Sequence, residues 1–554
     1  MTNGPSRHWV ELLADDVEAR WRASDDDRLV CASGISPSGP IHMGNLREVF
    51  TTHLVADALR RRGQPAVHLH SWDDYDRLRK VPAGVPAEFE RYVGMPLASV
   101  PDPLGELPSY ADRFIDEFTA ALSRLGIEIA PERQSVHYPA GRYNAQIRRA
   151  MDERGLVFDT LAEQQTEGRH ATPVQERRRA YYPFKPFCET CGKDATEVTG
   201  YDGTAVEYDC HACGHSGTMS LADGVRISGK LVWKVDWPMR WAFENVAYEP
   251  AGEDHHAPSG SFTVGRTLIR ELYGAEAPLT STYSFVSLSG VGGKMSGSVG
   301  TVVTPEAALE ILEPALVRWP YVQRTPNQSF GIDVSAKGIQ RQYDHWDQFV
   351  ATATAAEARA DQAANYRMSV QTEAGHVDRT ERPVSFRLLA SLADITNGNR
   401  EQMARIVASH LDGPLPETEQ LLAELEPRLS CALHYATEIV PPEQRTTIRE
   451  IFNVDAWATM DAKTREGVAM LVQGIPDHWS LEGLTTLVYG VPKRLLGLPP
   501  DTAPTPELKQ AQRQFFKALY QLLCSAETGP RLPTLMLSIG QDATLDLLGA
   551  RVRA

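Results

Sequence analysis

The sequence predicts an α/β domain with a doubly wound parallel sheet, interrupted by a cysteine-rich insertion and followed by an all-α carboxyl-terminal half. Three observations support this prediction: a strand–helix–strand pattern in the first 80 residues, two Cys-x2-Cys pairs between residues 188 and 213, and helical periodicity almost throughout the chain after Thr304. The chain has 554 residues, of which 42% are hydrophobic, so it can bury several cores.

The first strand is expected at residues 28–35, where the largely apolar run RLVCASGI is typical of a buried strand. Apolar residues then recur at helical spacing from Leu46 to Ala58, and Gly63 follows as a helix stop. The run AVHLHSW, residues 66–72, predicts a second strand. A strand, a helix and a strand in this order predict a parallel pair with a right-handed crossover, which is the start of a nucleotide-binding domain.

The pattern changes after about residue 81 and resumes after residue 229. Four elements are then expected, namely a strand at 230–236 (KLVWKVD), a helix at 237–246, a helix at 262–273 that Gly274 ends, and a strand at 282–289 (TYSFVSLS). The intervening segment is therefore predicted to be an insertion between two halves of one sheet domain. Beyond Thr304 we expect helices and no convincing strand.

Four of the seven cysteines form two closely spaced pairs with 18 residues between them: Cys188, Cys191, Cys210 and Cys213. Two such knuckles supply four thiolates in a tetrahedron, which predicts a closed, structural zinc site. Gly192 and Gly214 follow the second cysteine of each pair and fit the positive-φ turn of a knuckle. His211 and His215 are alternative ligands, but the simpler interpretation leaves them as neighbours.

Two loops have residues suited to binding phosphate. The loop after the first strand leads into a helix amino end, where backbone N–H groups and the helix dipole favour an anion. Gly44 permits close approach of a nucleotide, and His42 and Asn45 offer donors to phosphate oxygens. A second loop, GGKMSGS at residues 292–298, presents Lys294 to a leaving pyrophosphate. Because both loops are predicted at strand ends of one sheet, they would converge on one triphosphate and stabilise its developing charge.

The formal net charge of −16 excludes a dedicated, non-specific DNA coat protein, which would be basic. Local basic patches leave specific nucleic-acid binding open: Arg60–Arg62, then Arg142 with Arg148 and Arg149, and Arg177–Arg179 with Lys185. No run approaches the roughly 18 apolar residues of a membrane helix. The amino end has no apolar signal segment, so we expect a cytoplasmic protein.

The two loops resemble the signatures of a known enzyme class. HMGN at residues 42–45 and KMSGS at 294–298 are similar to the HIGH and KMSKS motifs of class I aminoacyl-tRNA synthetases. Archaeal-type class I lysyl-tRNA synthetases fit best, through the stretches 73–82, 233–241, 252–255 and 324–327 and the pair Tyr343-Asp344. The resemblance covers nearly the whole chain and is more specific before about Glu373.

The resemblance implies ATP-dependent activation of lysine to lysyl-adenylate and transfer of the lysyl group to the 2′-hydroxyl of the terminal adenosine of tRNA(Lys). It implies catalytic roles for His42, Asn45, Lys294, Ser296 and Ser298. ATP would contact Pro37, Ser38, Gly44, Gly252, Asp254, His255 and Met295. Lysine would contact Gly34, Ser36, Asp73, Trp233, Trp237, His255 and Tyr283, although the three aromatic residues Trp233, Trp237 and Tyr283 also suit plain core packing. Structural zinc and magnesium with ATP are the expected cofactors, and the enzyme is expected to be a monomer.

The same resemblance implies five regions. They are the first half of a Rossmann-type catalytic domain at 1–80, a connective insertion at 81–229 with the zinc module at about 180–220, the second half with the KMSKS-like loop at 230–304, a helical stem-contact domain at 305–372, and an all-α anticodon-binding domain at 373–554.

Three departures from the family pattern concern the rate of catalysis and leave the fold unchanged. Gly297 and Val299 replace residues that are usually polar or cationic, and Ser259-Gly260-Ser261 stands where two glycines are common. They leave open a specialised or duplicate synthetase. A non-catalytic tRNA-binding relative is disfavoured because His42, Asn45, Lys294 and Ser298 are all present. A small-molecule nucleotidylyltransferase is disfavoured because it needs neither the insertion nor the helical half.

Overall fold

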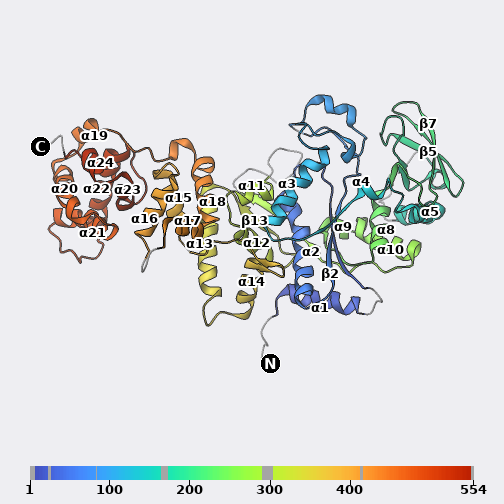
Figure 1. Cartoon of the computed structure of the whole chain (residues 1–554), viewed down its shortest axis with the longest axis horizontal. Coiled ribbons are helices and arrows are strands. Elements are labelled where there is room, and N and C mark those ends of the chain that lie inside the picture. The colour runs from blue at the N-terminus through green and yellow to red at the C-terminus, as the bar shows by residue number, and fades with distance from the viewer. Residues whose placement is uncertain are drawn as a thin grey trace. The chain divides into compact units, whose positions relative to one another are not determined.

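The computed structural model describes residues 7–22, 27–82, 84–163, 172–289, 303–382, 384–411 and 416–550. The chain divides into two compact units (Figure 1). The first unit comprises Met1–Leu309, Pro314–Ser335 and Gln348–Asp378, and the second comprises Glu310–Glu313, Ala336–Asp347 and Arg379–Ala554. The five regions expected from the sequence are finer than this division and stay a prediction.

A four-stranded parallel sheet forms the centre of the first unit, with the strand order β3-β2-β1-β9. Its strands are β1 (Leu29–Ile35), β2 (Ala66–Trp72), β3 (Ala130–Arg133) and β9 (Val246–Tyr248). β1 and β2 pair over their whole length, from Leu29 with Ala66 to Ile35 with Trp72. β3 lies within the segment 81–229 that was expected to be an insertion, so the central sheet takes one strand from that segment. β9 follows the segment in the chain and pairs with β1. The predicted fold class, a parallel α/β sheet domain with an insertion and a helical carboxyl-terminal half, is confirmed.

Helix α2 (Met43–Arg61) packs on β1 and β2, and α1 (Trp9–Trp21) packs against α2, as the blue part of Figure 1 shows. α2 begins where the side chain of His42 caps its first N–H groups. It ends before Gly63, which has a φ of 76° that favours glycine. α3 (Tyr110–Arg124) begins at a Ser109 cap and precedes β3.

The insertion contains short helices and two small antiparallel sheets. The helices are α4 (Gln134–His137), α5 (Asn144–Asp152), α6 (Arg154–Glu163) and α7 (Val174–Ala180). β4 (Phe184–Pro186) pairs with β8 (Gly229–Leu231), and β5 (Thr196–Tyr201), β6 (Ala205–Cys210) and β7 (Ser216–Ser220) form a three-stranded sheet. The three-stranded sheet carries Cys210, and the pair β4–β8 lies where the chain enters and leaves this cysteine-bearing part.

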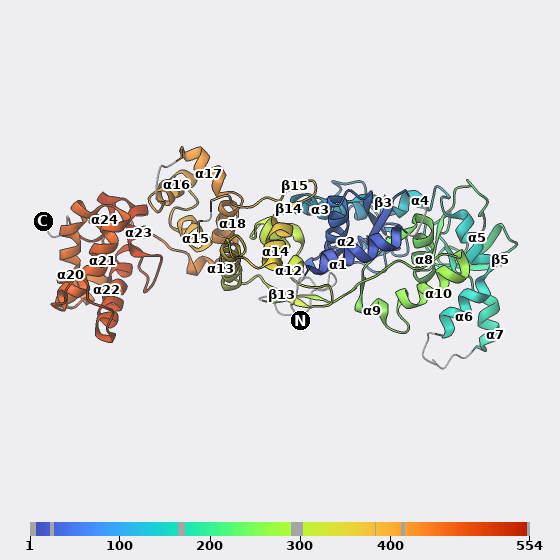
Figure 2. The same cartoon turned by 90° about the horizontal axis from the view of Figure 1, so that it is seen from below.

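Two elements after the insertion differ from the prediction. The expected strand at 230–236 is a strand only to Leu231, and α8 (Trp233–Glu244) starts within it. Trp233, Trp237 and Trp241 are spaced four residues apart, so a helix stacks their rings on one face, with centroids 5.1 and 4.8 Å apart. α10 (Ser261–Tyr273) lies beside α8 in Figures 1 and 2 and ends at Gly274 as predicted.

The expected single strand at 282–289 is two strands, β11 (Thr282–Tyr283) and β12 (Val286–Ser289). β11 pairs with β10 (Ala251–Gly252), which leads into α9 (Glu253–His256), whereas β12 pairs with β13 (Phe330–Asp333). The N–H of Ser284 donates to the carbonyl of Pro326 at 2.9 Å, which turns the chain between the two pairings. The expectation of no strand after Thr304 was therefore wrong, because a four-residue strand buried by a parallel partner has little sequence signal.

The first unit is completed by α11 (Pro305–Leu309), α12 (Pro314–Gln323), α14 (Ala360–Val370) and the short pair β14 (Gln371–Thr372) and β15 (Gly375–His376). Arg47 of α2 is buried and donates to the carbonyls of Thr325 (2.7 Å), Pro326 (3.0 Å) and Gln328 (3.3 Å). This contact ties the helix that follows the first loop to the segment before β13. α13 (Ala336–Ala353) belongs partly to each unit.

The second unit is helical, as Figure 2 shows. Its helices are α15 (Phe386–Ile395), α16 (Arg400–Ala408), α17 (Thr418–Leu425), α18 (Arg428–His434), α19 (Val454–Thr459), α20 (Ala462–Gly474), α21 (Leu481–Leu495), α22 (Pro506–Cys524), α23 (Leu532–Ile539) and α24 (Gln541–Leu547). Among all the residues described, no helix combines the length and apolar character needed to cross a membrane.

Candidate active site

The first phosphate loop is organised by a reciprocal cap at the start of α2. Nδ1 of His42 accepts hydrogen bonds from the N–H groups of Gly44 (3.1 Å) and Asn45 (3.3 Å), and Oδ1 of Asn45 accepts from the N–H of His42 (3.2 Å). Burial lowers the pKa of His42, so its ring is neutral at pH 7. Because Nδ1 is an acceptor, the proton sits on Nε2, which is then a donor available to a phosphate oxygen.

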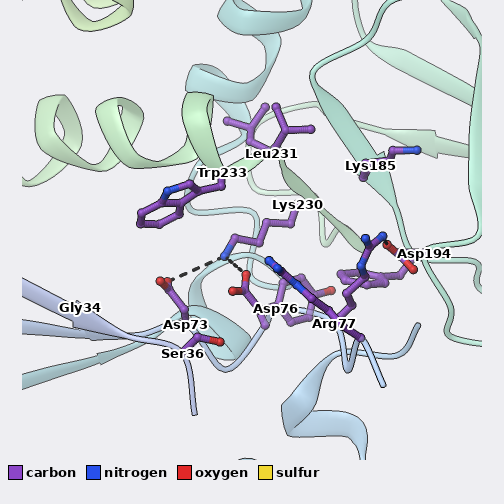
Figure 3. Close-up of a pocket in the computed structure, with 14 residues that line it drawn as sticks. Gly34, Ser36, Asp73, Asp76, Arg77, Lys185, Asp194, Lys230, Leu231 and Trp233 are labelled. Carbon is purple, nitrogen blue, oxygen red and sulfur yellow. Dashed lines mark hydrogen bonds and ion pairs between the residues drawn. The ribbon is translucent and has the colours of Figure 1, made fainter. Parts of the chain in front are cut away.

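A cavity of about 510 Å³ opens at the carboxyl ends of β1 and β2 (Figure 3). Four residues predicted to bind lysine line it: Gly34, Ser36, Asp73 and Trp233. Residues from the insertion side line it as well, among them Lys185, Asp194 and Lys230. The cavity is therefore bounded by the catalytic sheet on one side and by the insertion on the other.

A second cavity of about 440 Å³ adjoins the first, because Ser36, Asp76, Arg77 and Arg79 line both. It is also lined by the loop after β1, including Ser38, His42 and Asn45, and by Lys80. A neutral histidine donor, an amide and three cationic side chains suit a polyphosphate. Pro37, Gly44, Asp254 and Gly252 do not line this cavity, so the predicted ATP residues are only partly gathered around it.

A group of charged side chains lies on the floor of the first cavity. Nζ of Lys230 is 2.6 Å from a carboxylate oxygen of Asp76, 3.4 Å from Asp236 and 3.8 Å from Asp73. Arg240 reaches Asp73 at 2.9 Å and Asp236 at 3.3 Å. Within this group three carboxylates face two cations, while Arg77, Arg79 and Lys185 with Asp194 line the same cavity. Asp73 and Asp76 are the carboxylates of the group that line the cavity and could meet an ammonium group.

The structure adds Glu48 of α2, which sequence reasoning missed. One oxygen of Glu48 accepts from the N–H of Gly34 (2.8 Å), and the other accepts from the hydroxyl of Tyr283 (2.7 Å). Burial raises the pKa of Glu48 to about 8. The sequence did contain a signal for Glu48. This residue lies six residues after His42 on a helix predicted to face the sheet, and a carboxylate on a buried face needs a partner. Glu48 therefore links Gly34, which lines the cavity, to Tyr283, which is predicted to contact the substrate lysine.

Aromatic side chains extend from Trp233, which lines the first cavity. The ring of Trp233 stacks on Trp237 and lies under the guanidinium of Arg240, at 5.3 Å. Trp237 meets His255 edge-on, with ring centroids 5.3 Å apart. Trp237 and His255 do not line the cavity but support the residue that does. Of the seven residues predicted to bind lysine, four line the cavity, two are linked to it through Trp233 and one through Glu48 and Gly34, while their binding role stays a prediction.

The segment Ser259-Gly260-Ser261, which departs from the family's paired glycines, keeps a glycine at position 260, where a side chain would clash with the backbone. A Cβ at position 260 would lie 2.3 Å from the carbonyl oxygen of His255. Ser259 is exposed, and its carbonyl accepts from Lys234 at 2.8 Å. The turn after α9 therefore needs Gly260 and tolerates serine beside it.

The whole of the second loop, residues 292–298, lies outside the described residues. This applies to the predicted catalytic residues Lys294, Ser296 and Ser298, to Met295, and to the departures Gly297 and Val299.

The four paired cysteines come together. Their sulfur atoms all lie within 4.8 Å of one another, with Cys188 to Cys213 and Cys191 to Cys210 each at 3.7 Å. A tetrahedral ion with metal–sulfur bonds of about 2.3 Å requires sulfurs about 3.8 Å apart, so the set fits such an ion. The positive φ values of Gly192 (72°) and Gly214 (73°) are confirmed.

The two histidines of the second knuckle bond elsewhere. Nε2 of His211 lies 3.2 Å from Glu197, and Nε2 of His215 lies 2.8 Å from Glu189. The simpler interpretation, four cysteine ligands with histidine neighbours, is the one that the geometry supports.

The basic patches seen in the sequence are largely paired with carboxylates. Arg62 contacts Glu11, Asp15 and Glu18. Arg142 contacts Glu132 and Glu244, Arg148 contacts Asp223, and Arg178 contacts Asp159. These patches therefore offer less free positive charge than their sequence suggests.

Comparison with known proteins shows the class, a class I aminoacyl-tRNA synthetase, to which the parallel α/β fold conforms. A family model described as tRNA synthetases class I (K) matches residues 7–373, and the chain belongs to that family. The chain is 44% identical to a lysine–tRNA ligase of Streptomyces coelicolor, with 98% of each chain covered. It is 32% identical to the lysine–tRNA ligases of Pyrococcus horikoshii (98% and 99% covered) and Treponema pallidum (97% of each).

Proposed function

We propose that the chain is a lysine–tRNA ligase, which activates lysine with ATP and transfers the lysyl group to tRNA(Lys). The observation that carries the proposal is the first cavity, where Asp73 and Asp76 lie beside Lys230 and where Gly34 is held by Glu48. The whole-chain likeness to lysine–tRNA ligases at 44% identity supports it independently. Because the likeness spans 98% of both chains, the insertion and the helical half are part of the same enzyme.

Lysine carries two ammonium groups, and the site offers two carboxylate acceptors for them, of which Glu48 has a pKa of about 8 and would lose its proton when lysine binds. One is the group around Asp73, which lines the cavity, and the other is Glu48 with the hydroxyl of Tyr283. The indole face of Trp233 lies beside the same cavity and favours a cation. An amino acid with an apolar side chain has only its α-ammonium group, so it would leave one of these two acceptors without a cation, which disfavours its binding.

ATP would occupy the second cavity, with its phosphates at the amino end of α2. In the first step, a carboxylate oxygen of lysine attacks the α-phosphorus, and the bond from that phosphorus to pyrophosphate breaks. The Nε2–H of His42 and the side chain of Asn45 would donate to phosphate oxygens, and Lys294 would meet the charge that develops on pyrophosphate. Magnesium bound with ATP supplies further neutralisation of the phosphate charge.

In the second step the 2′-hydroxyl of the terminal tRNA adenosine attacks the lysyl carbonyl and AMP leaves. The acceptor end would meet the insertion and the catalytic domain, and the helical carboxyl-terminal half would read the anticodon. Unpaired bases are usually stacked on aromatic rings and read along their edges, so aromatic and polar side chains should contribute more than net charge to reading the anticodon. We place this enzyme in the cytoplasm as a monomer.

Zinc is the proposed occupant of the four-cysteine site. Four thiolates at tetrahedral spacing suit zinc better than the hard cations, which prefer oxygen ligands. With four protein ligands the site has no open position for substrate, so the metal's role would be structural. It would stabilise the folded form of the two knuckles, which lie within residues 188–213.

Lysine-dependent exchange of pyrophosphate into ATP tests the proposal. The purified chain is assayed with each of the twenty amino acids, with and without tRNA, and charging of tRNA(Lys) is measured in parallel. Exchange that depends on lysine, together with lysyl-tRNA formation, is the expected result. Exchange without any amino acid would indicate a nucleotidylyltransferase, and tRNA binding without exchange or charging would indicate a non-catalytic relative.

A further inference from the structure

The metal-binding knuckle lies directly against the wall of the two cavities. Asp194 follows the cysteine Cys191 by three residues and forms an ion pair with Arg77, as Figure 3 shows. Asp194 lines the first cavity, and Arg77 lines both. The first acidic residue after Cys191 therefore contacts a cation that lines both cavities.

Backbone hydrogen bonds reinforce this contact. The N–H of Asp194 donates to the carbonyl of Gly94 (2.9 Å), and the N–H of Gly94 donates to the carbonyl of Leu78 (2.9 Å). The N–H of Leu78 donates in turn to the carbonyl of Met95 (2.8 Å). A Cβ on Gly192 would lie 3.1 Å from the methyl carbon of Met95, so the knuckle is packed closely on this segment. Contacts thus run without a gap from the cysteines to Leu78, which lines the second cavity.

The segment that the knuckle holds is rich in positive charge. Arg77, Arg79 and Lys80 all line the second cavity, the one proposed for ATP. The side chain of Asp194 is 12% exposed, whereas that of Arg77 is 52% exposed, so the carboxylate is the fixed partner and the guanidinium keeps an open side. Long cationic side chains lose much rotamer freedom when they bind an anion, and a fixed backbone lowers that cost.

We propose that Asp194 is a positioning residue for the catalytic centre. By holding Arg77, it fixes the cationic segment 77–80 in the wall of the second cavity, so that metal binding in the insertion supports ATP binding as well as local folding. The inference rests on the proposed function, in which the second cavity binds ATP. It extends the role of the metal site beyond the insertion itself.

The variant Asp194→Asn tests this inference, because it removes the carboxylate charge and leaves all four cysteines in place. ATP affinity is measured by calorimetry, metal content by atomic emission, and kcat and KM by lysine-dependent pyrophosphate exchange with saturating tRNA. We expect the Kd and KM for ATP to rise about fivefold, the size that a partly exposed ion pair supports. kcat should change less than twofold, metal content should stay at the wild-type level, and Asp194→Glu should recover part of the ATP affinity.

Glu197→Gln is the matched control, since Glu197 is an acidic residue of the same insertion whose partner is His211. It should leave ATP affinity unchanged. The inference is overturned if metal-replete Asp194→Asn binds ATP as the wild type does, if Glu197→Gln weakens ATP equally, or if Asp194→Asn loses its metal, which would make Asp194 a folding residue. Absence of lysine-dependent exchange in the wild type would instead contradict the proposed function.

Discussion

The backbone N–H of Met43 donates a 3.1 Å hydrogen bond to the carbonyl oxygen of Val303. Met43 is the residue after His42 in the first loop, and Val303 follows the segment 290–302 that contains Lys294. The chain therefore returns from the second loop directly beside the cap of α2. The contact places Val303 beside His42, and a shared role for His42 and Lys294 on one triphosphate stays a prediction.

Lys294→Ala should slow lysine-dependent pyrophosphate exchange by two to three orders of magnitude, because a cation aimed at developing charge is typically worth about 3–4 kcal/mol in the transition state. The KM for lysine should change little, since the contact is made mainly as pyrophosphate leaves. His42→Ala should behave similarly, and the double variant should cost less than the product of the two. Near-wild-type exchange in Lys294→Ala would remove the second loop from the mechanism.

The four-cysteine site should lose its metal when one of its ligands is removed. Cys191→Ser should release the metal, because a four-ligand site couples binding to local folding. Hydrogen exchange should then become faster at residues 180–220. Cys524→Ser, which changes a buried cysteine of the second unit, serves as the control and should retain the metal. A purified wild-type chain without zinc would contradict the identity of the ion.

Local signals account for what the sequence could predict. The strands at 29–35 and 66–72 are continuous apolar runs, the helix stops at Gly63 and Gly274 depend on one residue each, and the metal site depends on cysteine spacing. These features are decided within a few residues of chain. The spacing of Trp233 from Trp237 was also visible, but the β-branched residues around it favoured a strand.

The rest depends on contacts between distant parts of the chain. Glu48 and Tyr283 are 235 residues apart, and the ion pair of Lys230 with Asp76 joins the insertion to the loop after β2. Neither pairing has a periodic pattern, because each is fixed by tertiary packing. The same holds for β13, whose partner β12 decides that four residues form a strand.

The second unit contains a buried ion pair that tests its stability. Arg428 is 3% exposed and reaches Glu313 at 2.7 Å and Asp347 at 2.8 Å. Arg428→Met should lower the free energy of unfolding by about 3–5 kcal/mol, because it leaves the buried carboxylate of Glu313 uncompensated. Adding Glu313→Gln should recover a large part of that loss. Chemical denaturation checks both variants, and an unchanged midpoint in Arg428→Met would show that the pair contributes nothing.

The affinity for lysine should depend on pH through the protonation of Glu48. Burial raises the pKa of Glu48 to about 8, so in the free enzyme the carboxyl is mostly protonated at pH 6.5 and cannot pair with an ammonium group. Lysine binding then requires loss of that proton. The KM for lysine should therefore fall about tenfold as pH rises from 6.5 to 8 and level off above, while both ammonium groups of lysine stay largely protonated.

Two variants separate Glu48 from its neighbours. Glu48→Gln should raise the KM for lysine at pH 8 by about a hundredfold, the cost of losing one partner of a buried charge pair, and abolish the pH dependence. Tyr283→Phe removes a hydroxyl that lowers the pKa of Glu48, so it should keep the dependence and shift its midpoint to higher pH. Exchange kinetics across this pH range measure all three enzymes. If the pH dependence of KM persists in Glu48→Gln, it arises from another group, namely Glu249, because burial raises the pKa of Glu249 to about 7. That result would contradict the assignment of the pH dependence to Glu48.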